Sequence, residues 1–272
     1  MTRTRTAAGR DLRRLQWIYI PALLALMDWR LDGQRFGAAE DWLTWGTWLL
    51  LVLMAALLPW VPEARRRLGL HLGMAYLFVL VGAWQPGEFY ARYCYRLGAV
   101  GLLAYATPWK TLRTPRCWLA LLLAIAMPWP LVTWRVLSQI SEPLQHLTAT
   151  WSGTLLYYLT YDVRVDGIWI HLPTGAVEIL YGCTPVPLLM ALLQAGLILR
   201  GLAHWNGAQK SWPRTLTWIF GLAIGLTVLR VAGLATVVHQ PAVFRYWHEE
   251  AGTQLVSMLA VVSLAIATGR RR

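Results

Sequence analysis

Charged residues are scarce in this sequence, and acidic residues are the scarcer kind. Asp, Glu, Lys and Arg make up 14% of the 272 residues, whereas about a quarter is usual for a soluble domain. Hydrophobic residues account for 57% of the chain. This composition argues against a soluble protein and predicts one polytopic membrane domain that covers residues 1–272.

The shortage of acids leaves a formal net charge of +12, from 25 basic and 13 acidic residues. Such a surplus indicates nucleic-acid binding when it is concentrated on one soluble face. In this chain the basic residues lie between apolar segments. We therefore expect the lipid bilayer, and no nucleic acid, as a partner.

Cysteine is also rare. Only Cys94, Cys117 and Cys183 are present, and they form neither a CxxC motif nor a metal-binding spacing. Their odd number leaves at least one free thiol. The sequence contains no HExxH motif, and no two carboxylates lie inside its predicted spans. These absences argue against a metalloprotease and an aspartyl intramembrane protease, and we expect no metal and no cofactor.

Long apolar segments are what the chain has instead. A membrane helix needs about 20 mainly apolar residues. Eight candidate spans lie near residues 15–29, 42–60, 68–84, 97–109, 117–134, 184–201, 215–238 and 253–268. The first and the fourth are short, so the number of spans could be seven. The predicted fold class is an all-α integral membrane protein with about eight transmembrane helices.

The distribution of basic residues predicts the orientation of these spans. With the N-terminus inside, the inner segments hold most of the Lys and Arg residues, including the runs at 65–67 and 270–272. Among the acids, only Asp11 and Glu63 fall there. Because basic residues favour the cytoplasmic side, we expect a multi-pass protein of the cell inner (plasma) membrane with both termini in the cytoplasm.

The longest segment between spans, residues 135–182, is predicted to lie on the outer side. Its first part, through Tyr158, fits a surface helix. Residues 161–165, 168–172 and 176–180 then have the composition of strands, and the dipeptide Asp166-Gly167 is favoured in two-residue hairpin turns. We expect a small extracytoplasmic β-meander, inserted in the membrane domain, that could offer an edge to an extended peptide.

Cys183 is the first candidate for chemistry. It precedes Thr184 and Pro185, which suit the first turn of a helix, so its thiol would lie near the positive end of a helix dipole. We expect this helix end to lower the pKa of the thiol and to supply free N–H groups for an oxyanion. The alternative is a buried structural cysteine.

Arg230 and His248 are the other candidates. Arg230 falls inside a span, where an arginine costs about 2.5–3.5 kcal/mol unless it finds protein, water or a counter-charge, or snorkels to the interface. His248 lies just before the last span and is followed by Glu249 and Glu250, while His239 is its main competitor as a base. A thiol, a fixed cation and a base on the outer side are the groups that covalent acyl transfer requires. Glycosyl transfer by the outer acids is a weaker alternative.

The order of these residues resembles the exosortase/archaeosortase family and, within it, the cyanobacterial branch. Family members carry a Cys-Ser-Gly-like motif after a Val-Glu-Val strand, then Asn-x-x-Arg in the next span and a His before the last span. In this chain Ala176-Val177-Glu178-Ile179 precedes Cys183, Thr227-Val228-Leu229-Arg230 fits the second motif, and His248 with Gly252 fits the third. The resemblance is best over residues 150–260.

Two positions depart from the family pattern. Thr184-Pro185 stands in place of Ser-Gly, and Thr227 stands in place of Asn. A threonine hydroxyl can still donate a hydrogen bond, whereas a proline removes one backbone N–H from any oxyanion site.

The resemblance implies a membrane-embedded cysteine transpeptidase or peptidase that acts in protein sorting. Cys183 would be the nucleophile, Arg230 would stabilise the oxyanion, and His248 would be the acid and base. The implied partners are membrane-anchored secreted proteins with a C-terminal sorting signal, made of a short Pro-Glu-Pro-like motif, a transmembrane helix and a basic tail. The site would face the extracytoplasmic side. The competing hypothesis is a non-catalytic scaffold or transporter component of exopolysaccharide export.

Overall fold

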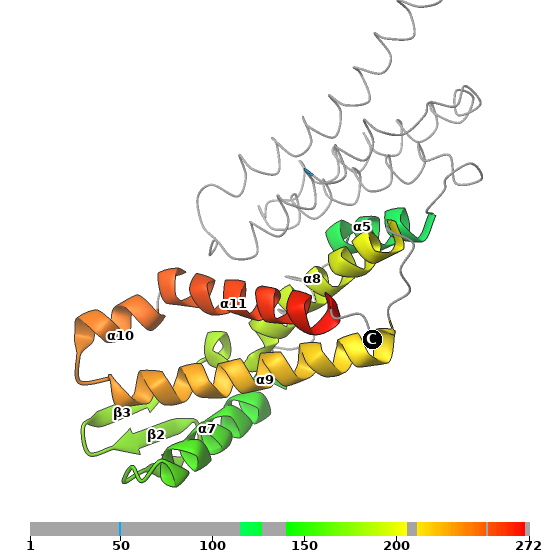
Figure 1. Cartoon of the computed structure of the whole chain (residues 1–272). Helices are drawn as coiled ribbons and strands as arrows, with labels where there is room; N and C mark the ends of the chain where they lie inside the picture. The colour runs from blue at the N-terminus through cyan, green and yellow to red at the C-terminus, as the bar shows by residue number, and fades with distance from the viewer. Residues whose placement is uncertain (1–48, 50–114, 127–139, 206–210, 249, 270–272) are drawn as a thin grey trace, which may run out of the picture. The chain divides into compact units, whose positions relative to one another are not determined.

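The structure, a computed structural model, describes residue 49 and residues 115–126, 140–205, 211–248 and 250–269 (Figure 1). The first five expected spans lie outside these ranges, apart from residue 49 and the part of the fifth that forms helix α5 (Pro115–Ala126). Among the described residues, residue 49, α5 and the end of α8 from Arg200 onward belong to one compact unit. All the other described elements belong to a second unit, which contains every candidate site residue.

Three helices of the described chain are long and apolar enough to cross a membrane. They are α8 (Pro185–Trp205), α9 (Trp212–Thr236) and α11 (Glu250–Gly269), with apolar windows at 185–204, 212–236 and 252–269. These windows coincide with the last three expected spans. The prediction of a mainly helical membrane protein is therefore confirmed.

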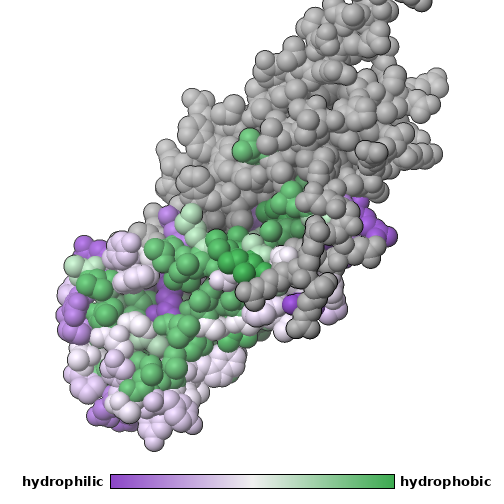
Figure 2. All heavy atoms as spheres, in the orientation of Figure 1, coloured by the Kyte–Doolittle hydropathy of each residue, from purple (hydrophilic) through white to green (hydrophobic). Residues whose placement is uncertain are grey.

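The outer faces of α9 and α11 are apolar. Phe220 and Leu229 on α9 and Met258, Val262 and Ile266 on α11 are all exposed. Figure 2 shows hydrophobic residues gathered along this face, while more hydrophilic residues gather around the end that carries helix α10 and the sheet. A helix surface of this composition is suited to lipid rather than to water.

Helix α7 (Ser141–Tyr158) and helix α9 approach closely because small residues line their contact. Ala149 and Ser152 are buried on α7, whereas the neighbouring Gly153 faces Val165. The hydroxyl of Ser152 lies 3.5 Å from the carbonyl oxygen of Val228 on α9. On α9 the buried residues recur at four-residue steps, at positions 215, 219, 223, 227 and 231. This spacing gives α9 one continuous buried face.

Three short strands follow α7. They are β1 (Arg164–Asp166), β2 (Trp169–Leu172) and β3 (Gly175–Glu178), and they form an antiparallel sheet in the order β1-β2-β3. Asp166 pairs with Trp169, so the first turn consists of Gly167 and Ile168. This turn lies one residue later than the expected Asp166-Gly167 turn. The φ of 61° at Gly167, the first central residue, fits a type II′ turn.

The register of the sheet points one face toward the helices. Ile170, Val177 and Ile179 are buried there, in a hydrophobic core shared with Leu156 of α7 and Val231 of α9. After β3 the chain enters a single 3₁₀ turn, η3 (Tyr181–Cys183), and then begins α8. The sheet therefore leads the chain directly to the candidate nucleophile.

Candidate active site

Cys183 is the last residue of η3, and the turn holds it through backbone hydrogen bonds. Its N–H donates to the Leu180 carbonyl at 2.9 Å, and the Thr184 N–H donates to the Tyr181 carbonyl at 3.0 Å. The Thr184 hydroxyl donates to the same Tyr181 oxygen at 2.7 Å. This bonding fixes the position of the thiol relative to both β3 and α8.

The same hydrogen bonds contradict the expected oxyanion site. The N–H groups of Cys183 and Thr184 are occupied within the turn. Pro185 and Pro187, in the first turn of α8, carry no N–H. Among the first four helix positions, only Val186 and Leu188 bring a donor, so the helix start offers a much poorer set of N–H groups than we expected.

The thiol of Cys183 is free and buried, with 4% of the residue exposed. Burial raises its pKa above the ordinary value of 9.0, while the charge of Arg230 and a backbone hydrogen bond at Leu180 act in the opposite direction. The expectation of a lowered pKa is therefore wrong for this state of the protein. The cation lies where we expected it, but the apolar packing around the sulfur outweighs it.

Arg230 reaches from α9 to the junction between α10 (Pro241–His248) and α11. One guanidinium nitrogen, Nη2, donates to the Thr253 hydroxyl at 2.7 Å. It also donates to the carbonyl oxygens of His248 and Trp247, at 3.3 and 3.4 Å. These two carbonyls lie at the C-terminal end of α10, where the helix dipole is negative. The cation is thus held by neutral oxygens within the span.

His248 ends α10, and its ring is half-buried. The imidazole stacks on the Phe244 ring, with centroids 5.2 Å apart and 14° between the planes. Its Nδ1 atom is buried without a hydrogen-bond partner. The expected influence of Glu249 and Glu250 concerns side chains that lie outside the described residues.

Within the described ranges, two buried side-chain nitrogens lack a partner, and both belong to the candidate site. They are Arg230 Nε and His248 Nδ1. Buried polar atoms in proteins are hydrogen-bonded in the large majority of cases, so two buried nitrogens without a partner call for an explanation. A donor on an arginine and a titratable nitrogen on a histidine are suited to a bound carbonyl group and its leaving amine.

Three segments bring these groups together. Arg230 is close enough to Cys183 for its charge to act on the thiol. Phe244, which stacks on His248, packs against the hydrophobic core that contains Cys183. The thiol, the guanidinium and the imidazole therefore gather from η3, α9 and α10. His239 differs from His248 because it is exposed in the turn after α9, where its Nε2 lies 3.0 Å from the Gln240 amide nitrogen.

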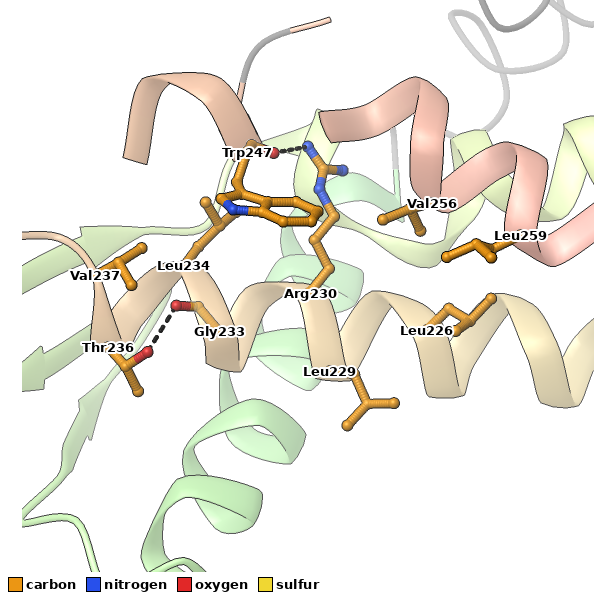
Figure 3. A pocket seen from close by; sticks show the side chains of 10 residues that line it. All are labelled: Leu226, Leu229, Arg230, Gly233, Leu234, Thr236, Val237, Trp247, Val256 and Leu259. Atoms are coloured by element: carbon orange, nitrogen blue, oxygen red, sulfur yellow. Dashed lines mark hydrogen bonds between the residues drawn. The ribbon is translucent and has the colours of Figure 1, made fainter. Parts of the chain in front are cut away.

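A groove of about 400 Å³ opens beside Arg230 (Figure 3). The Trp247 ring and Leu234 both line the groove, and the Arg230 side chain extends from α9 toward the Trp247 carbonyl. The groove is lined by Leu226, Leu229, Arg230, Gly233, Leu234, Thr236, Val237, Trp247, Val256 and Leu259. Cys183 and His248 are not part of this lining, so the groove reaches the cation but not the buried thiol.

Two residues of the site were not expected to take these roles. Thr253 orients the guanidinium, and Gly252 lets α11 start against α10, because an added Cβ would lie 2.5 Å from Trp247 Cα. Thr227, at the position where the family has Asn, is buried on α9 one turn before Arg230. In the described part of the chain, no group of three or more His, Cys, Asp or Glu side chains could hold a metal ion.

Comparison with known proteins gives one family. Residues 13–265 match the profile described as transmembrane exosortase. No curated protein and no solved structure matches the chain significantly. The match reaches well beyond residues 150–260, where the sequence motifs lie, and includes all five expected N-terminal spans. The chain therefore belongs to the transmembrane exosortase family.

Proposed function

We propose that this protein is a membrane cysteine transpeptidase that removes the C-terminal sorting tail of membrane-anchored secreted proteins and transfers them to an acceptor. One observation carries the proposal. A free thiol, a cation and a histidine lie in one region, and the cation and histidine each keep an unpartnered buried nitrogen. Buried polar atoms are hydrogen-bonded in the large majority of cases, so these two nitrogens mark a place where a bound group can pair with them.

The reaction begins at Cys183. His248 takes the thiol proton, and the sulfur attacks the scissile carbonyl, whose oxygen becomes negative. The C–N bond then breaks, and the leaving amine takes the proton from His248, which leaves a thioester on Cys183. The acceptor nucleophile next loses its proton to His248 and attacks the thioester. The sulfur departs and recovers the proton, which restores the starting enzyme.

Arg230 supplies the oxyanion site that the helix start lacks. Its Nη2 is fixed by Thr253 and by the end of α10, while its Nε–H remains free to donate. Fixed donors aimed at a developing charge are worth most in a water-poor site, because they need no reorganisation during the reaction. The same cation favours the thiolate once substrate is bound.

The substrate gains access when α10 moves. Cys183 is 4% exposed, so the sulfur cannot meet a polypeptide in the closed arrangement. Helix α10 has no buried residues, although it carries both Phe244 and His248. Displacement of this short helix therefore exposes Cys183 and costs the Arg230 hydrogen bonds to the Trp247 and His248 carbonyls, while Thr253 still holds the guanidinium.

The location follows from the charge pattern of the sequence. We place both termini in the cytoplasm, the protein in the cell inner membrane and the reaction on the extracytoplasmic side. The apolar segment of the sorting tail would cross the membrane beside the enzyme, with its basic tail held at the inner face. The scissile bond would then lie near the outer interface.

The test is co-expression with a tagged secreted protein that ends in a short Pro-Glu-Pro-like motif, an apolar span and a basic tail. Mass spectrometry then measures its new C-terminus. We expect tail removal with the native enzyme and with Cys117→Ala, which replaces the other buried free cysteine of the described chain. We expect none with Cys183→Ala. Normal processing by Cys183→Ala would overturn the proposal.

The second candidate is a non-catalytic membrane scaffold or transporter component of exopolysaccharide export. It is favoured by the burial of Cys183, which raises the thiol pKa as in a structural cysteine. In that case Arg230 would only tie α9 to α10 and α11. The scaffold predicts that Cys183→Ala leaves both tail processing and polysaccharide export unchanged.

A further inference from the structure

The sheet beside Cys183 has two edges of different character. The outer edge of β1 belongs to a strand of three exposed residues, with charged side chains at Arg164 and Asp166. Short, charged strands of this kind discourage further pairing. The outer edge of β3 carries Ala176 and Glu178, and β3 continues through η3 into Cys183. Only the second edge therefore leads to the candidate nucleophile.

The register identifies the backbone groups on the free side of β3. Ile179 donates its N–H to the Ile168 carbonyl at 2.9 Å, and Val177 pairs with Ile170. Hydrogen-bonded and non-hydrogen-bonded pairs alternate along an antiparallel ladder. The N–H and C=O groups of Ala176 and Glu178 consequently point away from β2, and within the described ranges no other strand pairs with them.

Helices cover a face of the sheet and leave this edge unpaired. The core packs against the face that carries Val177 and Ile179, while Ala176 and Glu178 have exposed side chains. Val238, after α9, approaches the start of the strand, where an added Cβ on Gly175 would lie 2.8 Å from its side chain. Beyond that point, no backbone hydrogen bond within the described ranges uses the outward groups of Ala176 and Glu178.

We infer that the outer edge of β3 binds an extended segment of the substrate polypeptide as a fourth strand. The inference rests on the proposed function and deepens it, since it states how the substrate is held. A peptide amide must be extended for its carbonyl to be reached, because a carbonyl inside a helix is already hydrogen-bonded. A peptide paired with Ala176 and Glu178 continues toward Cys183 within about five residues, each advancing about 3.3 Å.

The first test removes the outward N–H of β3. Proline is tolerated on an edge strand where its missing N–H faces away from the ladder, so Ala176→Pro leaves the β2–β3 pairing in place. We expect the initial rate of tail cleavage to fall roughly fivefold or more, the size of one lost hydrogen bond. Val165→Pro is the comparison variant on the other edge, because Val165 pairs with Ile170 and its N–H therefore faces outward from β1. It also removes a side-chain contact with Gly153 of α7, so both rates are taken per molecule of inserted enzyme. Equal rates for the two variants would overturn the inference.

The second test detects the strand without catalysis. Ala176→Cys is placed in a background with Cys94→Ala, Cys117→Ala and Cys183→Ala, and single cysteines are scanned through the segment of the tagged substrate that precedes its apolar span. A paired strand predicts disulfides at every second substrate position, because facing Cβ atoms lie about 5 Å apart. Disulfides that recur every third or fourth position, or that link two enzyme copies, would overturn it.

These tests separate the two proposals. If tail processing depends on Cys183 but the cysteine scan gives no alternating disulfides, the strand pairing is refuted and the proposed function is not. Alternating disulfides, together with normal processing by Cys183→Ala, refute the catalytic role of Cys183 and retain the strand as a binding site.

Discussion

Arg230 has a structural role, and the proposed function gives the same side chain a chemical one. A buried arginine is expensive inside a membrane, and this one is compensated by three neutral oxygens at the α10–α11 junction. All three contacts use Nη2, so the rest of the planar guanidinium is not used in holding α9 to the α10–α11 junction. A flexible ammonium could make the Thr253 contact but could not present a second fixed donor.

Arg230→Lys tests this division of roles. We expect the variant to insert in the membrane normally, because its charge remains, and to lose roughly 10²–10³-fold in tail-cleavage rate, as when one oxyanion donor is removed. The rate and the membrane-inserted amount are measured together. Thr253→Val is the companion variant: it removes the orienting hydroxyl and should slow cleavage less. A Lys variant with the native cleavage rate would show that Arg230 only connects α9 to α10 and α11.

The pH dependence of Cys183 alkylation follows from burial. A thiol with a raised pKa is mainly protonated near neutral pH, and its reactive thiolate increases as the pH rises. In the substrate-free protein we expect slow labelling by iodoacetamide at pH 7 and a rate that still increases above pH 9.0, the ordinary pKa.

Arg230→Gln supplies the control for this profile. Loss of the nearby positive charge should move the alkylation profile of Cys183 to still higher pH, because Arg230 lowers the thiol pKa. Rapid labelling at pH 7, or a profile that Arg230→Gln leaves in place, would contradict the account of the thiol.

At the residue scale, sequence could select the candidates but not their surroundings. Arg230 stands out as a charge in an apolar span, and Cys183 and His248 stand out by position and motif. The raised thiol pKa could not be foreseen, because it depends on burial in a core to which distant segments contribute, among them Val231 and Phe244. The sequence did not indicate the contact between Arg230 and Thr253 either, since threonine is common in apolar helices.

At the scale of elements, the start of α11 against α10 positions the cation. An added Cβ at Gly252 would lie 2.5 Å from Trp247 Cα and 2.8 Å from the Tyr246 carbonyl oxygen. Neither backbone atom can move without displacing the end of α10. Because the Trp247 and His248 carbonyls accept from Arg230, such a shift would also release the guanidinium.

Gly252→Ala should therefore impair the site through the backbone. Overpacking of this kind costs about 1–3 kcal/mol, and we expect lower protein levels together with a tail-cleavage rate per molecule that falls clearly. Gly225→Ala in α9 is the control, because an added Cβ there meets nothing within 4 Å. Equal cleavage rates for the two variants would show that the α10–α11 contact does not position Arg230.

The strands illustrate which local features sequence can predict. Alternation and turn residues placed strands at 161–165, 168–172 and 176–180, whereas the structure has them at 164–166, 169–172 and 175–178. The turn shifted because Gly167 takes the first central position, with its φ of 61°. A turn at Asp166-Gly167 and a turn at Gly167-Ile168 both place a glycine in the hairpin, so local sequence allows either register. Burial of Ile170 and Val177 against α7 and α9 selects the second.

At the scale of the whole molecule, apolar length was the most reliable guide. The last three expected spans match α8, α9 and α11 because a segment of about 20 apolar residues has few alternatives to a membrane helix. Local sequence could not show how α7 and the sheet pack on α9. That packing depends on small residues such as Ser152, which contacts α9, and Gly153, which contacts Val165 of β1, and their role appears only in these contacts.

The orientation in the membrane gives a separate prediction. In a cysteine-free background, His239→Cys should react with a membrane-impermeant thiol reagent in intact cells, since His239 is exposed and expected outside. Arg66→Cys, in the basic run 65–67 that is expected inside, should react only after lysis. Labelling of position 66 in intact cells would overturn the topology and the proposed location of the site.

The central claim is that Cys183 forms a covalent acyl intermediate. The most direct measurement is peptide mass spectrometry of enzyme co-expressed with the tagged substrate, quenched at low pH and examined before and after hydroxylamine. We predict that the peptide containing Cys183 carries the mass of the truncated substrate C-terminus as a thioester, which hydroxylamine removes. An unmodified Cys183 peptide in cells that accumulate processed substrate, or an equal adduct on Cys117, would contradict the account.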